Sequence, residues 1–452
     1  MDTPRDQQPL SSFALLKTAR FGPLFATQFL GAFNDNLYKN ALIVLLTFHT
    51  AQWTTLSAVT LTNLAAGLFI LPFFLFSATA GQLADKYDKA TLARLTKLLE
   101  IFILLLAGIG FWLESLAWLM LALFLMGLQS ALFGPIKYSI LPQHLASGEL
   151  VGGNALVEAG TFVAILIGTL AGGLIAALDH GTVWITALGL AIAILGYLTS
   201  RAIPAAAPPE PHLRVSFNAF RETWRVIGFA RESRSIFLAI LGISWFWLYG
   251  ALFLAQFPVY AKNILGGDEG SITLLLATFS IGIGVGSLVC EKLSAKRLEI
   301  GLVPLGALGM TLFALDFALA PPAAALTQAS PLPLSVMLQQ GHFQRILLDL
   351  LLLGACGGLY CVPLYALVQQ RSKPERRARI IAANNIMNSI FMVGSALFAA
   401  WFLGEGHAMP TLFILAAAAN TLVAIYIFTL APEYLLRARD YLCGRRGTGN
   451  GE

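Results

Sequence analysis

Long apolar stretches separated by short polar breaks run through almost the whole chain. An apolar helix needs about 20 residues to cross a hydrocarbon core roughly 30 Å thick. Twelve stretches are long enough, near 21–48, 56–80, 90–113, 116–141, 154–178 and 182–200, and then near 236–261, 271–291, 300–320, 346–370, 380–403 and 410–432. The residues before Phe21 are polar and lack an apolar signal-peptide core, so we expect no cleaved leader. The pattern predicts an all-α membrane protein with 12 transmembrane helices.

The composition and the placement of charge agree with this class. Hydrophobic residues make up 57% of the chain and charged residues 12%, with a mean hydropathy of +0.74, whereas a soluble domain carries about 25% charged residues. With both termini cytoplasmic, 25 of the 29 lysines and arginines fall on the inner side, Lys97 among them. Such a bias predicts a multi-pass protein of the cell membrane. The net charge of +5 follows from this bias, so it does not indicate nucleic-acid binding.

The four cysteines lie in predicted spans or on the inner side, without metal-ligand spacing. We therefore expect no disulfide, no metal and no cofactor.

The longest break in the apolar pattern covers residues 201–235. Four prolines open it, and Phe217, Phe220 and Trp224 then alternate with arginines at helical spacing. This favours an amphipathic helix on the cytoplasmic leaflet that joins two six-helix bundles in parallel pseudo-repeat, with a solvated tether as the alternative. The expected organisation is a cytoplasmic N-terminus (1–20), a first bundle (21–200), the linker (201–235), a second bundle (236–432) and a cytoplasmic tail (433–452).

The loop between the second and third spans reads Gly81-Gln-Leu-Ala-Asp85-Lys86-Tyr-Asp88-Lys89. It resembles the G-x-x-x-D-[RK]-x-G-[RK] loop of the major facilitator superfamily, with Asp88 in place of the second glycine. Gly81 permits a tight exit from the helix, and Asp85 can engage a neighbouring helix N-terminus or a basic partner. We expect Gly81, Asp85 and Lys86 to act in gating. The alternative is a merely positive inner loop.

The first span carries an unusual polar cluster, Asn34-Asp35-Asn36-Leu-Tyr-Lys39-Asn40. A charge at the bilayer centre costs roughly 2.5–3.5 kcal/mol on insertion scales. At 100° per residue, Gln28, Asp35 and Lys39 fall within about a 40° arc, with Asn36 on the adjoining flank. We expect this face to bind a polar substrate. The alternative is an Asp35–Lys39 ion pair at i,i+4 spacing that neutralises itself.

Two further charges lie at one depth near the inner ends of adjacent spans, Lys137 and Glu158. They are candidates for a gate or a head-group contact. The alternatives are that Lys137 extends its ammonium group to the cytoplasm and that Glu158 interacts favourably with the dipole at the N-terminus of its helix. Weaker substrate-binding candidates in the second half are Gln256, Asn385 and Asn388, although helix–helix hydrogen bonding is a common use of such asparagines.

Several segments together resemble the bacterial lysophospholipid transporters. They are Gln28-Phe-Leu-Gly-Ala-Phe-Asn-Asp-Asn36, Gly134-Pro-Ile-Lys-Tyr-Ser-Ile-Leu141, Asn154-Ala-Leu-Val-Glu-Ala159, Gly357-Gly-Leu-Tyr-Cys-Val-Pro-Leu364 and Asn384-Asn385. Ser244-Trp-Phe-Trp247, with Gln256, is most similar to the transporter module that some bacteria fuse to acyltransferase and acyl-carrier-protein synthetase domains.

The resemblance implies a monomeric flippase for lysophosphatidylethanolamine-type lipids, working from the outer to the inner leaflet of the bacterial inner membrane. A separate acyltransferase/acyl-carrier-protein synthetase would be its partner. Asp35 would receive the amine of the head group, and Lys39 or Lys137 the phosphate.

Catalysis is not expected, because His144 and Glu149 match an acyltransferase spacing only in a short loop without room for a catalytic domain. The alternative within transport is proton-coupled export of an amphipathic drug or metabolite, with Asp35 or Glu158 taking the proton.

Overall fold

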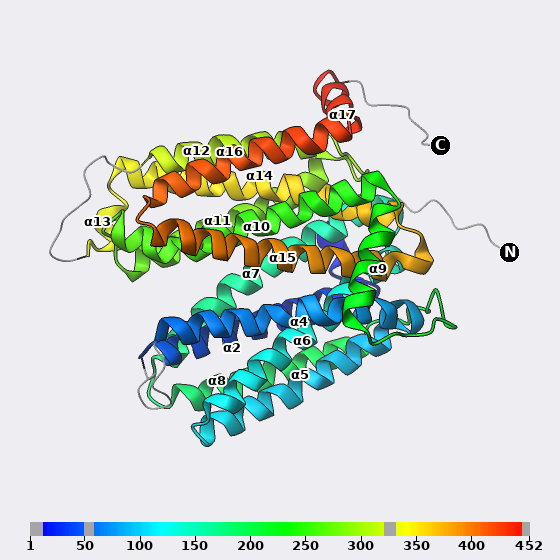
Figure 1. The fold of residues 1–452 in the computed structure, drawn as a ribbon, viewed down its shortest axis with the longest axis horizontal. Coiled ribbons are helices and arrows are strands. Elements are labelled where there is room, and N and C mark those ends of the chain that lie inside the picture. The colour runs from blue at the N-terminus through cyan, green and yellow to red at the C-terminus, as the bar shows by residue number, and fades with distance from the viewer. Residues whose placement is uncertain (1–11, 49–57, 321–330, 445–452) are drawn as a thin grey trace.

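The computed structural model describes residues 12–48, 58–320 and 331–444, and these form helices without a β-strand (Figure 1). The predicted all-α class is confirmed. The long helices are α2 (Gly22–Phe48), α4 (Ala58–Lys86), α5 (Lys89–Trp112), α6 (Leu116–His144), α7 (Leu150–Ala176) and α8 (Gly181–Arg201), followed by α10 (Arg234–Asn263), α11 (Glu269–Leu293), α12 (Leu302–Leu319), α14 (Gly341–Arg371), α15 (Arg377–Gly404) and α16 (Met409–Leu430). Arg5, Arg445 and Arg446, which are among the 25 lysines and arginines predicted to lie on the inner side, are outside the described residues.

Eleven of the described helices are long and apolar enough to cross a membrane. The remaining long helix, α2, has 27 residues, and its Asn-Asp-Asn and Lys-Asn segments lower its hydropathy. The predicted count of twelve is therefore consistent with the structure once α2 is included.

The helices form two groups that lie side by side (Figure 1). We call α2 and α4–α8 the first half, and α10–α12 and α14–α16 the second half. Within the first half α2 packs closely on α7. A Cβ at Gly168 or Gly172 would collide with the carbonyl oxygens of Phe33 and Leu37, so glycine at these two positions allows the close approach. The corresponding contact in the second half joins α11 to α14. Small residues of this kind let helix backbones approach each other in membranes.

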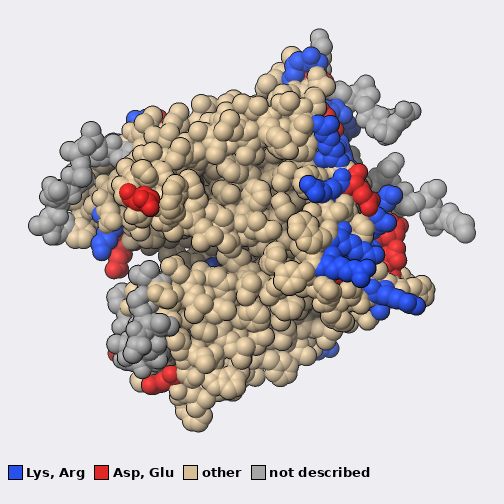
Figure 2. Space-filling view, in the orientation of Figure 1, with Lys and Arg blue, Asp and Glu red and all other residues tan. Residues whose placement is uncertain are grey.

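One end of the molecule, which we call the basic end, carries both described chain ends and most of the visible lysines and arginines (Figure 2). At the opposite end the space-filling surface is hollowed between the two halves. The halves are therefore in closer contact at the basic end.

The linker between the halves is bound across the basic end. Asp88 caps α5 by accepting the Thr91 N–H at 2.8 Å, and it accepts the linker N–H of Ala206 at 2.6 Å. Partial burial acts to raise the pKa of Asp88, but these donors outweigh it and hold the pKa below its usual 3.8. Gln82 of α4 exchanges two hydrogen bonds with the backbone of Ser216, at 2.9 and 3.1 Å.

The linker ends in helix α9 (Ala219–Arg231), which packs on α4 and α15 through Val226 and Ala230. Phe217, Phe220 and Trp224 stay between 66% and 79% exposed. The structure thus contains an amphipathic helix in the predicted segment. Its contact with a lipid leaflet remains a prediction.

Candidate functional site

The basic end is closed by contacts between the two halves, and the predicted gating loop takes part in them. Asp85 accepts a hydrogen bond from Nε of Arg379 at 2.8 Å and one from the N–H of Ala378 at 3.1 Å, both at the start of α15. Gly81 lies where a Cβ would stand 2.8 Å from the Cβ of Ala382. Asp85 thus meets both kinds of partner considered for it, and Gly81 allows α4 to lie against α15. Lys86 instead lies over the ring of Tyr87, at 5.4 Å.

Two more pairs join the halves near this end. The rings of Tyr138 on α6 and Tyr365 on α14 stack with centroids 4.4 Å apart. Asn154 on α7 and Gln369 on α14 exchange side-chain hydrogen bonds of 2.7 and 2.9 Å. We call these two pairs, together with Asp85–Arg379, the basic-end seal. Its members come from α4, α6 and α7 on one side and from α14 and α15 on the other.

Lys137 and Glu158 lie directly at this seal. The hydroxyl of Tyr138 donates to one oxygen of Glu158, and Nζ of Lys137 lies 4.7 Å from the centre of the Tyr138 ring. Among the described residues the two charges form no ion pair within 4 Å, so the direct pairing considered for them is not present. The tyrosine competes successfully for the carboxylate. The second oxygen of Glu158 is buried and has no described partner.

On the polar face of α2, Asp35 and Lys39 do not pair with each other. Asp35 accepts a hydrogen bond from the hydroxyl of Ser130 on α6. Lys39 donates to the Asn36 amide oxygen at 3.0 Å and lies 5.3 Å from the ring of Phe69 on α4. The i,i+4 spacing therefore does not bring Asp35 and Lys39 into an ion pair, because each side chain finds a nearer partner.

Buried polar atoms without a described partner gather on α2 and α7. They are Nε2 of Gln28, Oδ1 of Asn34, one oxygen of Asp35 and one oxygen of Glu158. Gln28 uses its oxygen to accept from Thr161 of α7 at 3.1 Å, which leaves its amine free. An unsatisfied buried polar atom costs about 1–3 kcal/mol. A polar ligand bound at these atoms can supply the missing hydrogen bonds.

A charged network that sequence reasoning missed lies behind Asp35. Nζ of Lys97 contacts a Glu100 oxygen at 2.6 Å, and both side chains are essentially inaccessible. Glu100 also accepts from Asn34 at 2.8 Å and from Gln129 at 3.1 Å. The assignment of Lys97 to the inner side is wrong: the residue is in α5 and its side chain turns into the first half to pair with Glu100 one turn on.

This network reaches the polar face of α2 through two adjacent residues of α6. Gln129, which donates to Glu100, accepts at 3.2 Å from Ser130, the residue that donates to Asp35. Glu100 lies within the predicted span 90–113, and this carboxylate is a sequence signal for the arrangement, because a buried carboxylate needs a partner.

The candidates of the second half carry no charge. Asn388 accepts from the Ser244 hydroxyl at 2.8 Å. Asn385 packs against Gly134 of α6, where any Cβ would collide with its amide nitrogen. Gln256 is half-buried and makes no hydrogen bond within the described residues. The charged groups of the candidate site therefore come from the first half.

The sequence model of the Major Facilitator Superfamily matches residues 24–390. Lysophospholipid transporter LplT of Klebsiella pneumoniae is 30% identical over 82% of this chain and 85% of its own. LplT of an Enterobacter species is 28% identical, over 81% of this chain and 85% of its own. The chain belongs to the major facilitator superfamily and to its lysophospholipid transporter family.

Solved structures of other transporters share the fold. The transporter FucP in its outward conformation superimposes with a TM-score of 0.69 at 13% identity, covering 91% of this chain and 98% of FucP. A bacterial homologue of the iron transporter ferroportin, in an outward-facing state, gives 0.64 at 15% identity, covering 90% and 99%.

Membership of this family points to a transporter and not to an enzyme. The two residues of the acyltransferase-like spacing have separate partners. Both oxygens of Glu149 accept hydrogen bonds from Arg20, each at 2.6 Å. His144 instead faces the backbone oxygen of Ala205, at 3.4 Å.

Proposed function

We propose that this protein is a lysophospholipid transporter that moves lysophosphatidylethanolamine-type lipids from the outer to the inner leaflet of the bacterial inner membrane by alternating access. The observation that carries the proposal is the set of buried, unpartnered polar atoms on Gln28, Asp35 and Glu158. A zwitterionic head group offers both donors and acceptors to them. The names of the relatives supply the substrate class.

The hollow in the surface supports the direction of access in this proposal. The basic end is assigned to the cytoplasm, because inner loops of membrane proteins are enriched in lysine and arginine. The hollow then faces outward, and the basic-end seal is a closed inner gate. Transport requires the first bundle (21–200) and the second bundle (236–432) to rock against each other until the seal opens.

Each candidate residue has a role in the proposal. Asp35 receives the amine, Lys39 or Lys137 receives the phosphate, and Gln28, Asn36 and Glu158 complete the polar wall. Facing them in the second half are Gln256, Asn385 and Asn388. Gly81, Asp85 and Lys86 belong to the inner gate. The protein acts as a monomer, and a separate acyltransferase/acyl-carrier-protein synthetase re-acylates the delivered lipid.

Proton-coupled export of an amphipathic compound is the second candidate. It is favoured by two buried carboxylates, Asp35 and Glu158, each of which accepts a hydrogen bond from a hydroxyl group. Such groups are usual proton carriers in transporters. Collapsing the proton gradient separates the two, because export would stop while facilitated uptake of a lysophospholipid would continue.

The test is uptake of labelled lysophosphatidylethanolamine into spheroplasts that express the protein. Asp35→Asn and Lys137→Ala should each lower uptake about tenfold or more, since a hydrogen bond to a charged group is worth about 1.5–3 kcal/mol. Lys292→Gln, an exposed change on α11, is the matched control and should transport normally. Normal uptake by both site variants would disprove the site. No uptake by the unaltered protein would disprove the substrate.

A further inference from the structure

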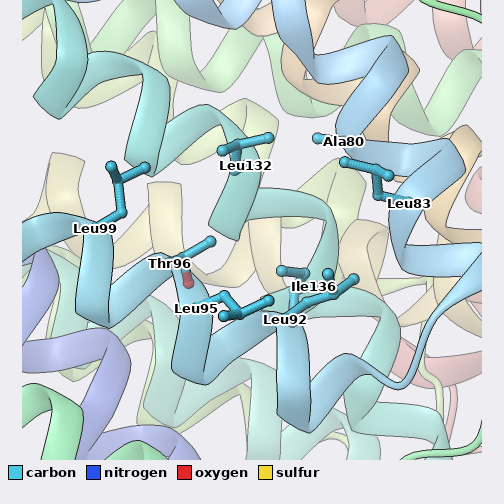
Figure 3. A pocket seen from close by; sticks show the side chains of 8 residues that line it. All are labelled: Ala80, Leu83, Leu92, Leu95, Thr96, Leu99, Leu132 and Ile136. Carbon is cyan, nitrogen blue, oxygen red and sulfur yellow. The ribbon is translucent and has the colours of Figure 1, made fainter.

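An apolar hollow lies between α4, α5 and α6 (Figure 3). Its volume is about 150 Å³, and Leu83, Leu92, Leu99, Leu132 and Ile136 are among the residues that line it. Thr96 contributes the single polar side chain. A dry apolar cavity of roughly this size accepts a benzene-sized hydrocarbon. The hollow can therefore hold a segment of an acyl chain.

A second, smaller hollow of about 40 Å³ lies one helical turn nearer the basic end. It is lined by polar residues, including Lys89, Ser139, Gln143 and Arg377. Lys89 precedes Leu92 of the apolar hollow by three residues on α5, and Ser139 follows Ile136 by three residues on α6. Three residues of helix rise about 4.5 Å. The two hollows are thus neighbours along the same pair of antiparallel helices.

The polar hollow contains two cations, Lys89 and Arg377, that form no ion pair within 4 Å with any described residue. Lys89 is 2% exposed, and its Nζ forms no hydrogen bond or ion pair with any described residue. The Nε of Arg377 is buried and likewise has no described partner. Its Nη2 donates to the backbone oxygen of Ser372 at 3.2 Å.

Asp85, Asp88 and Glu375 attract these two cations from nearby, but none of them contacts either cation in an ion pair. Asp85 is bound by Arg379 at 2.8 Å, and Asp88 is bound by the cap of α5 and by the linker. Two like charges held in a partly desolvated hollow repel each other unless an anion lies between them.

We propose that these hollows form a binding site for an anionic phospholipid of the leaflet at the basic end. Its phosphate lies between Lys89 and Arg377, with Ser139 and Gln143 as hydrogen-bond partners, and one acyl chain enters the apolar hollow. Basic pockets between membrane helices are common binding sites for acidic head groups. The adjacent apolar hollow favours a lipid over free phosphate as the source of the anion.

The site has a consequence for access, because its two cations belong to different halves. Lys89 begins α5 of the first half, and Arg377 begins α15 of the second half, two residues before Arg379 of the basic-end seal. A phosphate bound between them links the halves while the seal is closed. The lipid is therefore a stabiliser of the closed basic end, separate from any lipid that is transported through the cleft.

The test is the affinity of the purified full chain in detergent for dioleoylphosphatidylglycerol, read from the rise in melting temperature with lipid concentration. Lys89→Gln and Arg377→Gln should each raise the apparent Kd about tenfold, the loss expected for one charge-assisted hydrogen bond. Lys89→Arg should retain binding, and Lys292→Gln on exposed α11 should have no effect. Unchanged affinity in both charge-removing variants would overturn the proposal.

The source of the phosphate and the role of the chain have their own controls. Equal stabilisation by inorganic phosphate would show a free-anion site and refute the lipid. Equal stabilisation by phosphatidylcholine would refute recognition of negative charge. Leu132→Trp fills the apolar hollow, and it should weaken binding of the dioleoyl lipid but not of a dihexanoyl analogue. If Lys89→Gln does not fold, the lipid affinities of Leu132→Trp and Arg377→Gln still test the proposal. None of these measurements depends on transport of a lysophospholipid.

Discussion

Breaking the Lys97–Glu100 pair from its two sides should have unequal effects. Glu100, Lys97 and Lys39 all act electrostatically on Asp35, so the Lys97–Glu100 pair is part of a larger buried charge group. Lys97→Met removes the cation that contacts Glu100 and leaves two neighbouring buried carboxylates. Glu100→Gln leaves Lys97 near Asp35, and the amide can still accept the hydrogen bond that Asn34 donates at 2.8 Å.

The magnitudes follow from this difference. Removing one partner of a buried pair costs about 3–5 kcal/mol, and we expect Lys97→Met to lie in that range. Glu100→Gln should cost about 1–3 kcal/mol, because Asp35 compensates part of the charge on Lys97. The double variant removes one positive and one negative charge together, which restores the net charge of the parent, and should therefore be more stable than Lys97→Met alone.

The assay is reversible unfolding of the purified protein by titration with a denaturing detergent, which gives the free energy of unfolding of each variant. Arg376→Gln is the control, because its ion pair with Glu232 has side chains that are 41% and 60% exposed. It should cost less than about 1 kcal/mol. The reasoning fails if Glu100→Gln is as damaging as Lys97→Met, or if the two changes are additive.

Three further changes test the basic end. Asp88→Ala removes the cap of α5 and should lower the free energy of unfolding by about 1 kcal/mol. Since the pKa of Asp88 in the folded protein lies below 3.8, the full loss should be seen at neutral pH and should disappear as the pH falls through that folded pKa. Melting curves recorded from neutral to strongly acidic pH measure this. Asp85→Asn weakens the contact with α15, so Cys290, which is 0% exposed, should react faster with a maleimide in a Cys443→Ser background. Gly81→Val should have the same effect on labelling by separating α4 from α15, and equal labelling rates in both variants and the parent would contradict the assigned seal.

The helices were predictable because each depends on a local property, the length of an apolar stretch. The polar cluster of α2 was visible for the same reason, since charges within a span are costly wherever they point. Predicted and observed limits differ by a few residues, for example at α7, which begins at Leu150 and not at Asn154.

The partners of the polar residues were much harder to predict. Spacing along α2 brought Asp35 and Lys39 together, but Ser130 on another helix is the actual partner of Asp35. Asn154 and Gln369 are 215 residues apart in the sequence, and nothing local indicates that they pair. Which side chains meet across helices is decided by packing of the whole bundle, and a single sequence does not contain that information in readable form.

The attachment of the linker to the basic end has a mechanical consequence. The backbone N–H of Glu210 donates to the backbone carbonyl oxygen of Asp85 at 2.9 Å, and Gln82 binds Ser216. The linker segment therefore runs along the end of α4 and is attached to it. α9 then bridges from α4 to α15. When the halves separate at this end, the linker must either move with α4 or break its hydrogen bonds to α4. The length of the linker and these hydrogen bonds therefore resist opening. Lengthening the linker would change the rate of the conformational change without altering any residue of the candidate site.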